Sequence, residues 1–209
     1  MNISNKEHWN EIYEALDPDE LTWYEEIPAP SMKLLSKCNI HKDEPILDVG
    51  AGASTFIDNL IEQGFENIIA TDISNIALNK LKERLGKEKA AKVRWVADDI
   101  TQPAHIQNLR DVAVWHDRAV LHFLLEEHQQ HTYLSTLKKV IKKGGYVIIA
   151  AFSLKGVRKC SGLDIKNYDQ DMLAEFLGED FSLLEYFDYT YYMPSGKPRP
   201  YVYTLFQKK

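Results

Sequence analysis

The sequence predicts an α/β fold of the Rossmann-like kind, in which a mostly parallel sheet carries helices on both faces. Three observations predict it. Short apolar runs alternate with amphipathic stretches along most of the chain, which is typical of a parallel sheet covered on both sides. A glycine-rich turn, Gly50-Ala51-Gly52, directly follows the first of these runs. The last two runs are separated only by turn-forming residues, which predicts an antiparallel hairpin at the C-terminus.

Five apolar runs are expected to form the parallel strands. They cover residues 45–49, 68–71, 93–97, 112–115 and 146–152. The fifth run, YVIIAAF, is apolar at nearly every position, as in a strand that is buried on both faces. The hairpin strands are expected over 181–193 and 201–207, because the segment PSGKPRP between them is too short for a crossover helix.

Helices are expected between the strands, where cap and stop residues flank amphipathic stretches. They cover residues 54–63, 74–85, 126–141 and 169–177. Ser74 is expected to cap the second helix and Gly86 to end it. Near the N-terminus, apolar residues from Trp9 to Leu16 recur at helical spacing, which favours a helix packed on the sheet.

The composition is that of a globular protein with one domain. The 209 residues are 44% hydrophobic and 27% charged, and no run is long enough to span a bilayer. Residues 1–20 are polar and acidic, without the apolar stretch of a signal peptide, so we expect a cytoplasmic protein. We expect a single domain over residues 1–209. Its parts are a helical lid segment (1–44), a ligand-binding core (45–152), and a substrate loop, helix and hairpin (153–209).

Charge and cysteine content exclude several classes of function. The net charge is −6, and the basic clusters at 80–92 and 138–143 are interleaved with apolar residues, so nucleic acid is not expected as a substrate. Cys38 and Cys160 are too few for a disulfide framework and are expected as reduced thiols. The histidines from His116 to His131 lack a metal-ligand spacing, so no metal is expected.

The strongest functional motif is Asp48-Val49-Gly50-Ala51-Gly52, at a predicted strand-to-helix turn. Gly50 and Gly52 allow a tight bend and a close approach of a ligand to the main chain. Thr55 stands where the dinucleotide fingerprint has its third glycine. Asp48 would repel a pyrophosphate, whereas it would attract a ligand that carries an ammonium and a sulfonium. This difference favours S-adenosylmethionine over NAD or ATP.

Carboxylates also follow the second and third predicted strands. Asp72 is placed to accept hydrogen bonds from both ribose hydroxyls, and Asp99 to accept one from the adenine amine. Ile73 and Ile100 are expected to pack on the faces of the adenine ring, with Ser54 at the same site. Each carboxylate alone fits a helix cap or a loop end equally well, but their joint position at strand ends favours cofactor binding.

These motifs resemble a known family. The stretch from Pro45 to Phe152 resembles the class I S-adenosylmethionine-dependent methyltransferases in its motifs DVGAG, TDIS and ADDIT. The motifs HWNEIYE, LTWYEE, WHDRAVLHFL and KCSGLDIKNYD, with the tyrosine-rich hairpin, resemble a bacterial group within it. The chain is more distantly similar to lysine methyltransferases of elongation factor 1A and citrate synthase. In the bacterial group a glutamine usually follows the Trp-Tyr pair, where this chain has Glu25.

The resemblance implies a seven-stranded sheet whose last strand is reversed. It also implies cofactor contacts at Asp48, Gly50, Gly52, Asp72 and Asp99.

Candidate catalytic residues follow the fourth predicted strand. His116 or Asp117 is expected to orient a nucleophile or to accept its proton. The alternative is that Asp117 pairs with Arg118 and only shapes the loop. Residues 116–120 lack the Asn/Asp-Pro-Pro-aromatic motif of methyltransferases that act on amines of nucleic-acid bases.

The acceptor site is expected between the N-terminal segment and the loop after the fifth strand. Trp23 and Tyr24 are expected to form a lid over the cofactor and an apolar wall for the substrate. Cys160 and Ser161 are expected to face the substrate from the loop. A nucleophilic role for Cys160 is not expected, because methyl transfer from a sulfonium is a direct displacement.

Together these observations predict methyl transfer to a small molecule by a monomer or weak homodimer. The compact chain, without an added recognition domain, favours the small molecule. A protein lysine is the alternative, favoured by the distant resemblance and the acidic balance. A non-catalytic sensor of S-adenosylmethionine would share the fold. A closed aromatic cavity would indicate a small-molecule acceptor, and an exposed acidic groove a protein.

Overall fold

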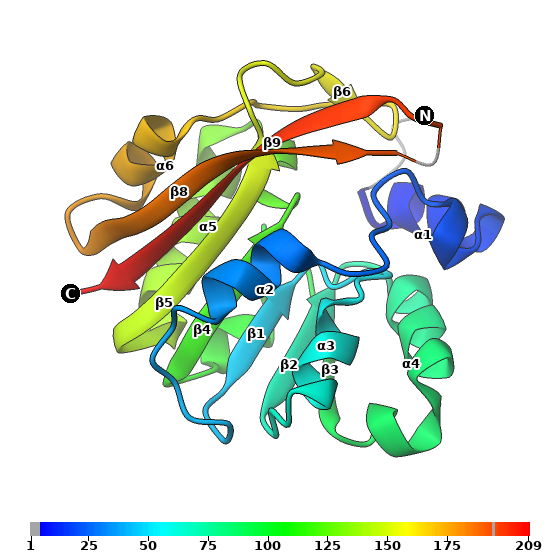
Figure 1. The fold of residues 1–209 in the computed structure, drawn as a ribbon, viewed down its shortest axis with the longest axis horizontal. Coiled ribbons are helices and arrows are strands. Elements are labelled where there is room, and N and C mark those ends of the chain that lie inside the picture. The colour runs from blue at the N-terminus through cyan, green and yellow to red at the C-terminus, as the bar shows by residue number, and fades with distance from the viewer. Residues whose placement is uncertain (1–4, 194) are drawn as a thin grey trace.

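The computed structural model describes residues 5–193 and 195–209. Residues 1–4 of the predicted lid segment and Pro194 of the predicted hairpin turn lie outside this range. The described residues form a seven-stranded sheet with helices on both faces (Figure 1). Its strands are β1 (Ile46–Val49), β2 (Ile68–Asp72), β3 (Val93–Ala97), β4 (Val112–Arg118), β5 (Ile141–Phe152), β8 (Phe181–Tyr192) and β9 (Pro198–Lys208).

The strand order is β3-β2-β1-β4-β5-β9-β8. The pairings among β1 to β5 are parallel, whereas β9 is antiparallel to both of its neighbours. The predicted fold class is therefore confirmed, including the reversed last strand and the C-terminal hairpin. Because the order reverses between β1 and β4, ligands are expected beyond the carboxyl ends of these two strands.

The described residues form six α-helices around the sheet. These helices are α1 (Asn5–Ala15), α2 (Ala29–Leu35), α3 (Phe56–Glu62), α4 (Asn75–Ala90), α5 (Glu127–Val140) and α6 (Gln170–Leu177). Buried side chains of α2, α3 and α4 share one hydrophobic core with the sheet, and those of α5 and α6 belong to a second core. No helix among the described residues has the length and apolar character needed to cross a membrane.

The fourth strand continues further than the sequence predicts. β4 was expected to end at Trp115, but it extends through Arg118 because it stays paired with β1 as far as Asp117 and with β5 as far as Arg118. Asp48 of β1 is in register with His116, and Arg118 with Ala150 of β5. The expectation that His116 and Asp117 lie in a loop is therefore wrong. Ala119 ends the strand with a φ of 73°, an unusual conformation for a residue other than glycine.

Helix α4 begins where the sequence predicts, but it continues past its predicted end. The Ser74 hydroxyl caps it by accepting a hydrogen bond from the Ala77 amide at 3.1 Å. Gly86 interrupts the helical geometry with a φ of 72° and a ψ of 164°, after which another turn follows to Ala90. The predicted stop at Gly86 is thus a kink within a longer helix.

Helix α1 does not pack on the sheet, which corrects the expectation for the segment from Trp9 to Leu16. It packs against α4, and its buried Tyr13 clusters with Ala53 of the glycine turn and Ala77 of α4. Figure 1 shows α1 above α4, beyond the carboxyl end of the sheet. This position places the N-terminal segment over the expected ligand site.

Candidate active site

A cavity of about 440 Å³ lies at the carboxyl ends of the central strands. Its volume falls within the range of about 300–1,000 Å³ that is typical of small-molecule sites. All residues predicted to bind the cofactor line it: Asp48, Gly50, Gly52, Ser54, Asp72, Ile73, Asp99 and Ile100. Residues from three separate strand ends are thus brought together in one cavity.

The two glycines of the turn after β1 leave no room for side chains. Gly50 and Gly52 have φ values of 65° and 49°, in the left-handed region that favours glycine. A Cβ on Gly50 would lie 2.1 Å from a methyl group of Val120, and one on Gly52 would lie 2.3 Å from the Tyr13 hydroxyl. The turn therefore requires glycine both for its backbone conformation and for its close contacts.

Asp48 is the end of a buried chain of polar contacts. His116 Nδ1 donates to Asp48 Oδ1 at 2.6 Å, and His116 Nε2 lies 2.8 Å from the Ser31 hydroxyl. The imidazole ring also stacks on Phe56, with the ring centroids 3.9 Å apart. His116 lines the cavity, as expected of a residue near the nucleophile. Both of its ring nitrogens have partners, however, so its contacts favour a role in orienting Asp48 over the expected roles of orienting the nucleophile or accepting its proton.

The second oxygen of Asp48 has no hydrogen-bond partner among the described residues. A buried carboxylate oxygen without a donor is energetically costly. Asp48 lines the cavity, so a cationic ligand group there would supply the missing donor. The ammonium group of S-adenosylmethionine has the charge and the donors that this position needs, so the residues present fit the cofactor.

Asp72 bridges the glycine turn and α4. Its Oδ2 accepts a hydrogen bond from the Gly52 amide at 2.9 Å, and its Oδ1 accepts one from the Ser74 amide at 2.8 Å. Each carboxylate oxygen can accept a further bond, which leaves capacity for a ligand with two hydroxyls. Burial raises the pKa of Asp72 to about 6, although the amide of Ser74 acts in the opposite direction.

The adjacent carboxylates after β3 have different surroundings. Asp98 accepts hydrogen bonds from the amides of residues 104–106 and thereby anchors the loop that follows. Asp99 Oδ1 accepts from the amide and the hydroxyl of Thr101, at 2.8 and 2.7 Å. The described residues supply no such bond to Asp99 Oδ2, so Asp99 has the more available acceptor. This difference supports the choice of Asp99 for the adenine amine.

Asp117 lies outside the cavity lining. Its Oδ1 accepts from the Val120 amide at 2.8 Å, and its Oδ2 accepts from the Leu121 amide at 3.1 Å and the Tyr133 hydroxyl at 2.6 Å. The expected role toward the nucleophile does not fit, because the carboxylate lies away from the cavity and accepts from the turn after β4 and from Tyr133. The expected ion pair does not form either, because Arg118 pairs with Glu25. Asp117 thus shapes the turn that carries Ala119 and Val120 to the cavity.

The predicted substrate residues only partly meet in the cavity. Trp23, Tyr24 and Cys160 line it, but Ser161 does not. The loop instead forms a small antiparallel pair, β6 (Lys159–Cys160) with β7 (Leu163–Asp164), and Ser161 lies at its turn with a φ of 50°. Cys160 on β6 therefore lines the cavity, whereas Ser161 belongs to the turn of the pair and does not.

Several residues of the site were missed by sequence reasoning. Glu25, Arg118, Phe123 and Tyr201 all line the cavity, as does Trp9, which was expected in the core. The Trp9 ring packs edge-on against Phe123, with centroids 5.1 Å apart. Nothing in the spacing of these residues signals their meeting, since they come from five separate segments. The position of Glu25 beside the Trp-Tyr pair is the one signal that could have indicated it.

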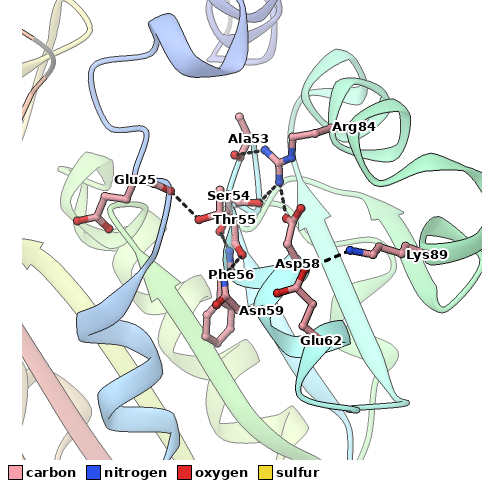
Figure 2. A network of polar contacts seen from close by, with 10 residues as sticks. All are labelled: Glu25, Ala53, Ser54, Thr55, Phe56, Asp58, Asn59, Glu62, Arg84 and Lys89. Atoms are coloured by element: carbon pink, nitrogen blue, oxygen red, sulfur yellow. Dashed lines mark hydrogen bonds and ion pairs between the residues drawn. The ribbon is translucent and has the colours of Figure 1, made fainter.

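Arg84 of α4 holds the glycine turn from outside the cavity (Figure 2). Its guanidinium donates to the main-chain carbonyls of Ala53 at 2.7 Å and Ser54 at 2.6 Å, and to Asp58 at 2.6 Å. A planar guanidinium satisfies several acceptors in a fixed geometry. Arg84 therefore fixes the main chain that follows Gly52.

Residues 46–145 match a protein family described as a methyltransferase domain. Among curated proteins, it is 24% identical over 164 residues to mouse (Mus musculus) EEF1A lysine methyltransferase 2, covering 71% of this chain and 66% of that protein. To the human (Homo sapiens) protein of the same name it is 23% identical over 198 residues, covering 88% of this chain and 76% of that protein.

Solved structures share the fold at low sequence identity. A SAM-dependent methyltransferase from Anabaena variabilis superposes with a TM-score of 0.78 and 14% identity, covering 100% of this chain and 96% of that one. The N-methyltransferase NodS from Bradyrhizobium japonicum, in complex with S-adenosylhomocysteine, has a TM-score of 0.74 and 15% identity, covering 96% and 98%. Fold, cavity and family match agree. The chain is thus similar to the class I S-adenosylmethionine-dependent methyltransferases in its fold and in the domain match over residues 46–145.

Proposed function

We propose that this chain transfers a methyl group from S-adenosylmethionine to a small molecule. The observation that carries the proposal is that one cavity is lined both by the strand-end residues predicted to bind the cofactor and by a group of aromatic side chains, which we name its cofactor half and its acceptor half. The cofactor half is lined by Asp48, Gly50, Gly52, Asp72, Ile73, Asp99 and Ile100. The acceptor half is lined by Trp23, Tyr24, Glu25, Arg118, Phe123, Cys160 and Tyr201. An aromatic acceptor half of this kind suits a small organic molecule.

In the cofactor half, three carboxylates are proposed to hold the cofactor. Asp48 Oδ2 would accept from the ammonium group, Asp72 from the ribose hydroxyls and Asp99 from the adenine amine. Ile73 and Ile100 would pack against the adenine ring. When bound, the cofactor supplies a methyl carbon that is activated by a positively charged sulfur.

The contribution of the protein to the reaction is mainly positioning. Displacement at a methyl carbon requires the attacking atom to be close and in line, and holding it there lowers the barrier. The aromatic side chains of the acceptor half exclude water, which strengthens electrostatic interactions inside the cavity. We propose that residues 5–28 act as the lid that closes it, since Trp9, Trp23 and Tyr24 all contribute to the lining, whereas α2 packs on the sheet.

A lysine side chain of a protein is the second candidate acceptor. It is supported by the similarity to EEF1A lysine methyltransferase 2, which extends over 88% of this chain in the human protein. An outer groove of about 420 Å³, lined by residues 24–27 and 189–192, adjoins the lid segment and could receive a peptide.

Methyl transfer from S-adenosylmethionine labelled in its methyl group tests the proposal. A cell extract is separated by ultrafiltration into a small-molecule and a protein fraction, and each is incubated with the protein. Label in the small-molecule fraction supports the proposal, and label confined to protein lysines supports the second candidate. Asp72→Ala serves as the control without cofactor binding. Failure to label either fraction, with cofactor bound, contradicts both.

A further inference from the structure

We propose that Glu25 binds the nitrogen of the methyl acceptor, so that the substrates of this chain are amines. The inference rests on the proposed function and names the substrate class of the same site. It is carried by the geometry of the acceptor half, where a buried ion pair faces the cavity.

Glu25 is a buried carboxylate with spare acceptors. Its side chain is only 7% exposed, and it lines the cavity. Its Oε2 lies 3.0 Å from Arg118 Nη2, but neither of its oxygens has a well-aligned hydrogen-bond donor among the described residues. A buried carboxylate needs donors for its remaining lone pairs. A ligand with N–H groups would supply them.

The main chain around Glu25 is fixed by three elements. The carbonyls of residues 23–25 accept, in chain order, from Arg118 Nη1 at 3.0 Å, the Tyr191 hydroxyl at 2.5 Å and the Thr55 hydroxyl at 2.7 Å. Figure 2 shows the last of these bonds, which ties the lid segment to the glycine turn. A carboxylate held this way is preorganised for binding.

The charges beside Glu25 favour a cation or neutral amine over an anion. The Nε and Nη1 groups of Arg118 donate to the Tyr203 hydroxyl at 3.2 Å and to the Trp23 carbonyl, and only Nη2, beside Glu25, has no aligned acceptor among the described residues. A carboxylate ligand at Nη2 would meet the negative charge of Glu25, which already pairs with this cation. Burial raises the pKa of Glu25, while Arg118 opposes this shift. The Tyr201 ring, 5.4 Å from the Arg118 guanidinium, completes the wall.

Glu25 lies where the cavity adjoins the outer groove. Tyr24 and Glu25 line both the cavity and the outer groove of residues 24–27 and 189–192. An amine entering between the lid segment and β8 would therefore meet Glu25 before it reaches the cofactor half.

Methyl transfer to a free amine requires no further reactant. The free amine donates an N–H to Glu25, and its lone pair forms the new bond to the methyl carbon. The bond between that carbon and sulfur breaks, and its electron pair returns to sulfur, which leaves S-adenosylhomocysteine. The nitrogen becomes a methylated ammonium, which pairs with Glu25 and loses its proton to water after release.

The test is calorimetric titration of the protein saturated with S-adenosylhomocysteine. Three ligands share one skeleton: phenylethylamine, phenylethanol and phenylpropionate. We expect the amine to bind at least about tenfold more tightly than the other two, as for a charge-assisted hydrogen bond. In Glu25→Gln the amine should lose about tenfold in affinity, whereas phenylethanol and S-adenosylhomocysteine should change less than about twofold.

Glu26→Gln is the matched control, because Glu26 lines the outer groove but not the cavity, and it should bind as the wild type does. The inference is overturned if the alcohol or the carboxylate binds the wild type as tightly as the amine, or if the amine does not bind. It is also overturned if Glu25→Gln keeps its preference for the amine. Failure of the wild type to bind S-adenosylhomocysteine would instead refute the proposed function. Unchanged affinity for S-adenosylhomocysteine in Glu25→Gln shows that the variant is folded.

Discussion

The two halves of the cavity are built by different means. In the cofactor half, the key carboxylates stand where β1, β2 and β3 end, and main-chain amides support them: Asp72 accepts from Gly52 and Ser74. In the acceptor half, side chains from distant segments hold each other, as Glu25 and Arg118 do. The sheet topology thus determines the cofactor half, whereas long-range side-chain packing determines the acceptor half.

This difference has a functional consequence. The parallel sheet and its glycine turn fix the cofactor half, so its geometry can be kept while the acceptor half changes with the substrate. Such a division agrees with the general rule that one fold supports many activities through its loops. Substitutions in the cofactor half should therefore change cofactor affinity, and those in the acceptor half should change the choice of acceptor.

The largest effect is expected from Asp72→Ala. The variant removes the proposed acceptor of two ribose hydrogen bonds, each to a charged group and worth roughly 1.5–3 kcal/mol. We expect the affinity for S-adenosylhomocysteine, measured by calorimetry, to fall about a hundredfold or more. Equal affinity in the variant and the wild type would show that the ribose lies elsewhere.

Cofactor affinity should also depend on pH through Asp72. Its pKa in the free protein is raised from 3.8 to about 6, so the carboxyl becomes protonated as the pH falls through that value. The protonated form is the poorer acceptor, and binding of S-adenosylhomocysteine should weaken about tenfold between pH 7 and pH 5. Asp117 also titrates near 6 because of burial, but it lies outside the cavity.

Asp72→Asn separates these two groups. The variant should bind S-adenosylhomocysteine more weakly than the wild type, but its affinity should not fall further between pH 7 and pH 5. If the affinity of the variant still falls in this range, the pH dependence belongs to Asp117.

His116→Phe tests the chain of contacts that orients Asp48. The affinity for S-adenosylhomocysteine should fall about fivefold, because the Asp48 carboxylate loses its hydrogen bond from His116. The affinity for methylthioadenosine, which lacks the amino-acid part of the ligand, should stay the same. Ser31→Ala is the matched control, since it leaves the bond between His116 and Asp48 in place. Equal losses for both ligands would mean that His116 only stabilises the fold.

The smallest effect is expected from Arg84→Gln, which acts from outside the cavity. Loss of its bonds to the carbonyls of Ala53 and Ser54 should loosen the glycine turn and weaken binding of S-adenosylhomocysteine about threefold. Lys89→Gln is the control in the same network (Figure 2), because its pair with Glu62 at 3.2 Å is exposed and contributes little. Equal effects of both substitutions would exclude a specific role of Arg84.

The same contrast explains what the sequence could predict. Asp48, Asp72 and Asp99 were found because strand boundaries follow from local apolar patterns, and parallel strands bring their ends together. Glu25 and Arg118 were not recognised as a pair, because their contact depends on how the lid segment folds back over β4. Local sequence patterns do not encode such a contact.

The errors have specific physical causes. Asp117 was expected in a loop because the apolar pattern of the fourth strand stops at Trp115, yet pairing with β1 and β5 extends the strand. The segment from Trp9 to Leu16 has an apolar stripe, but that stripe does not specify its partner. Its partner is α4 rather than the sheet, which places Trp9 at the cavity.

Calorimetric titration with S-adenosylmethionine, S-adenosylhomocysteine and NAD tests the central claim most directly. The claim is that the carboxylates at the strand ends form a site for a cationic, phosphate-free nucleoside. It predicts micromolar binding of the first two ligands and none of NAD, because Asp48 would repel a pyrophosphate. Binding of NAD, or binding of none of the three, would contradict it.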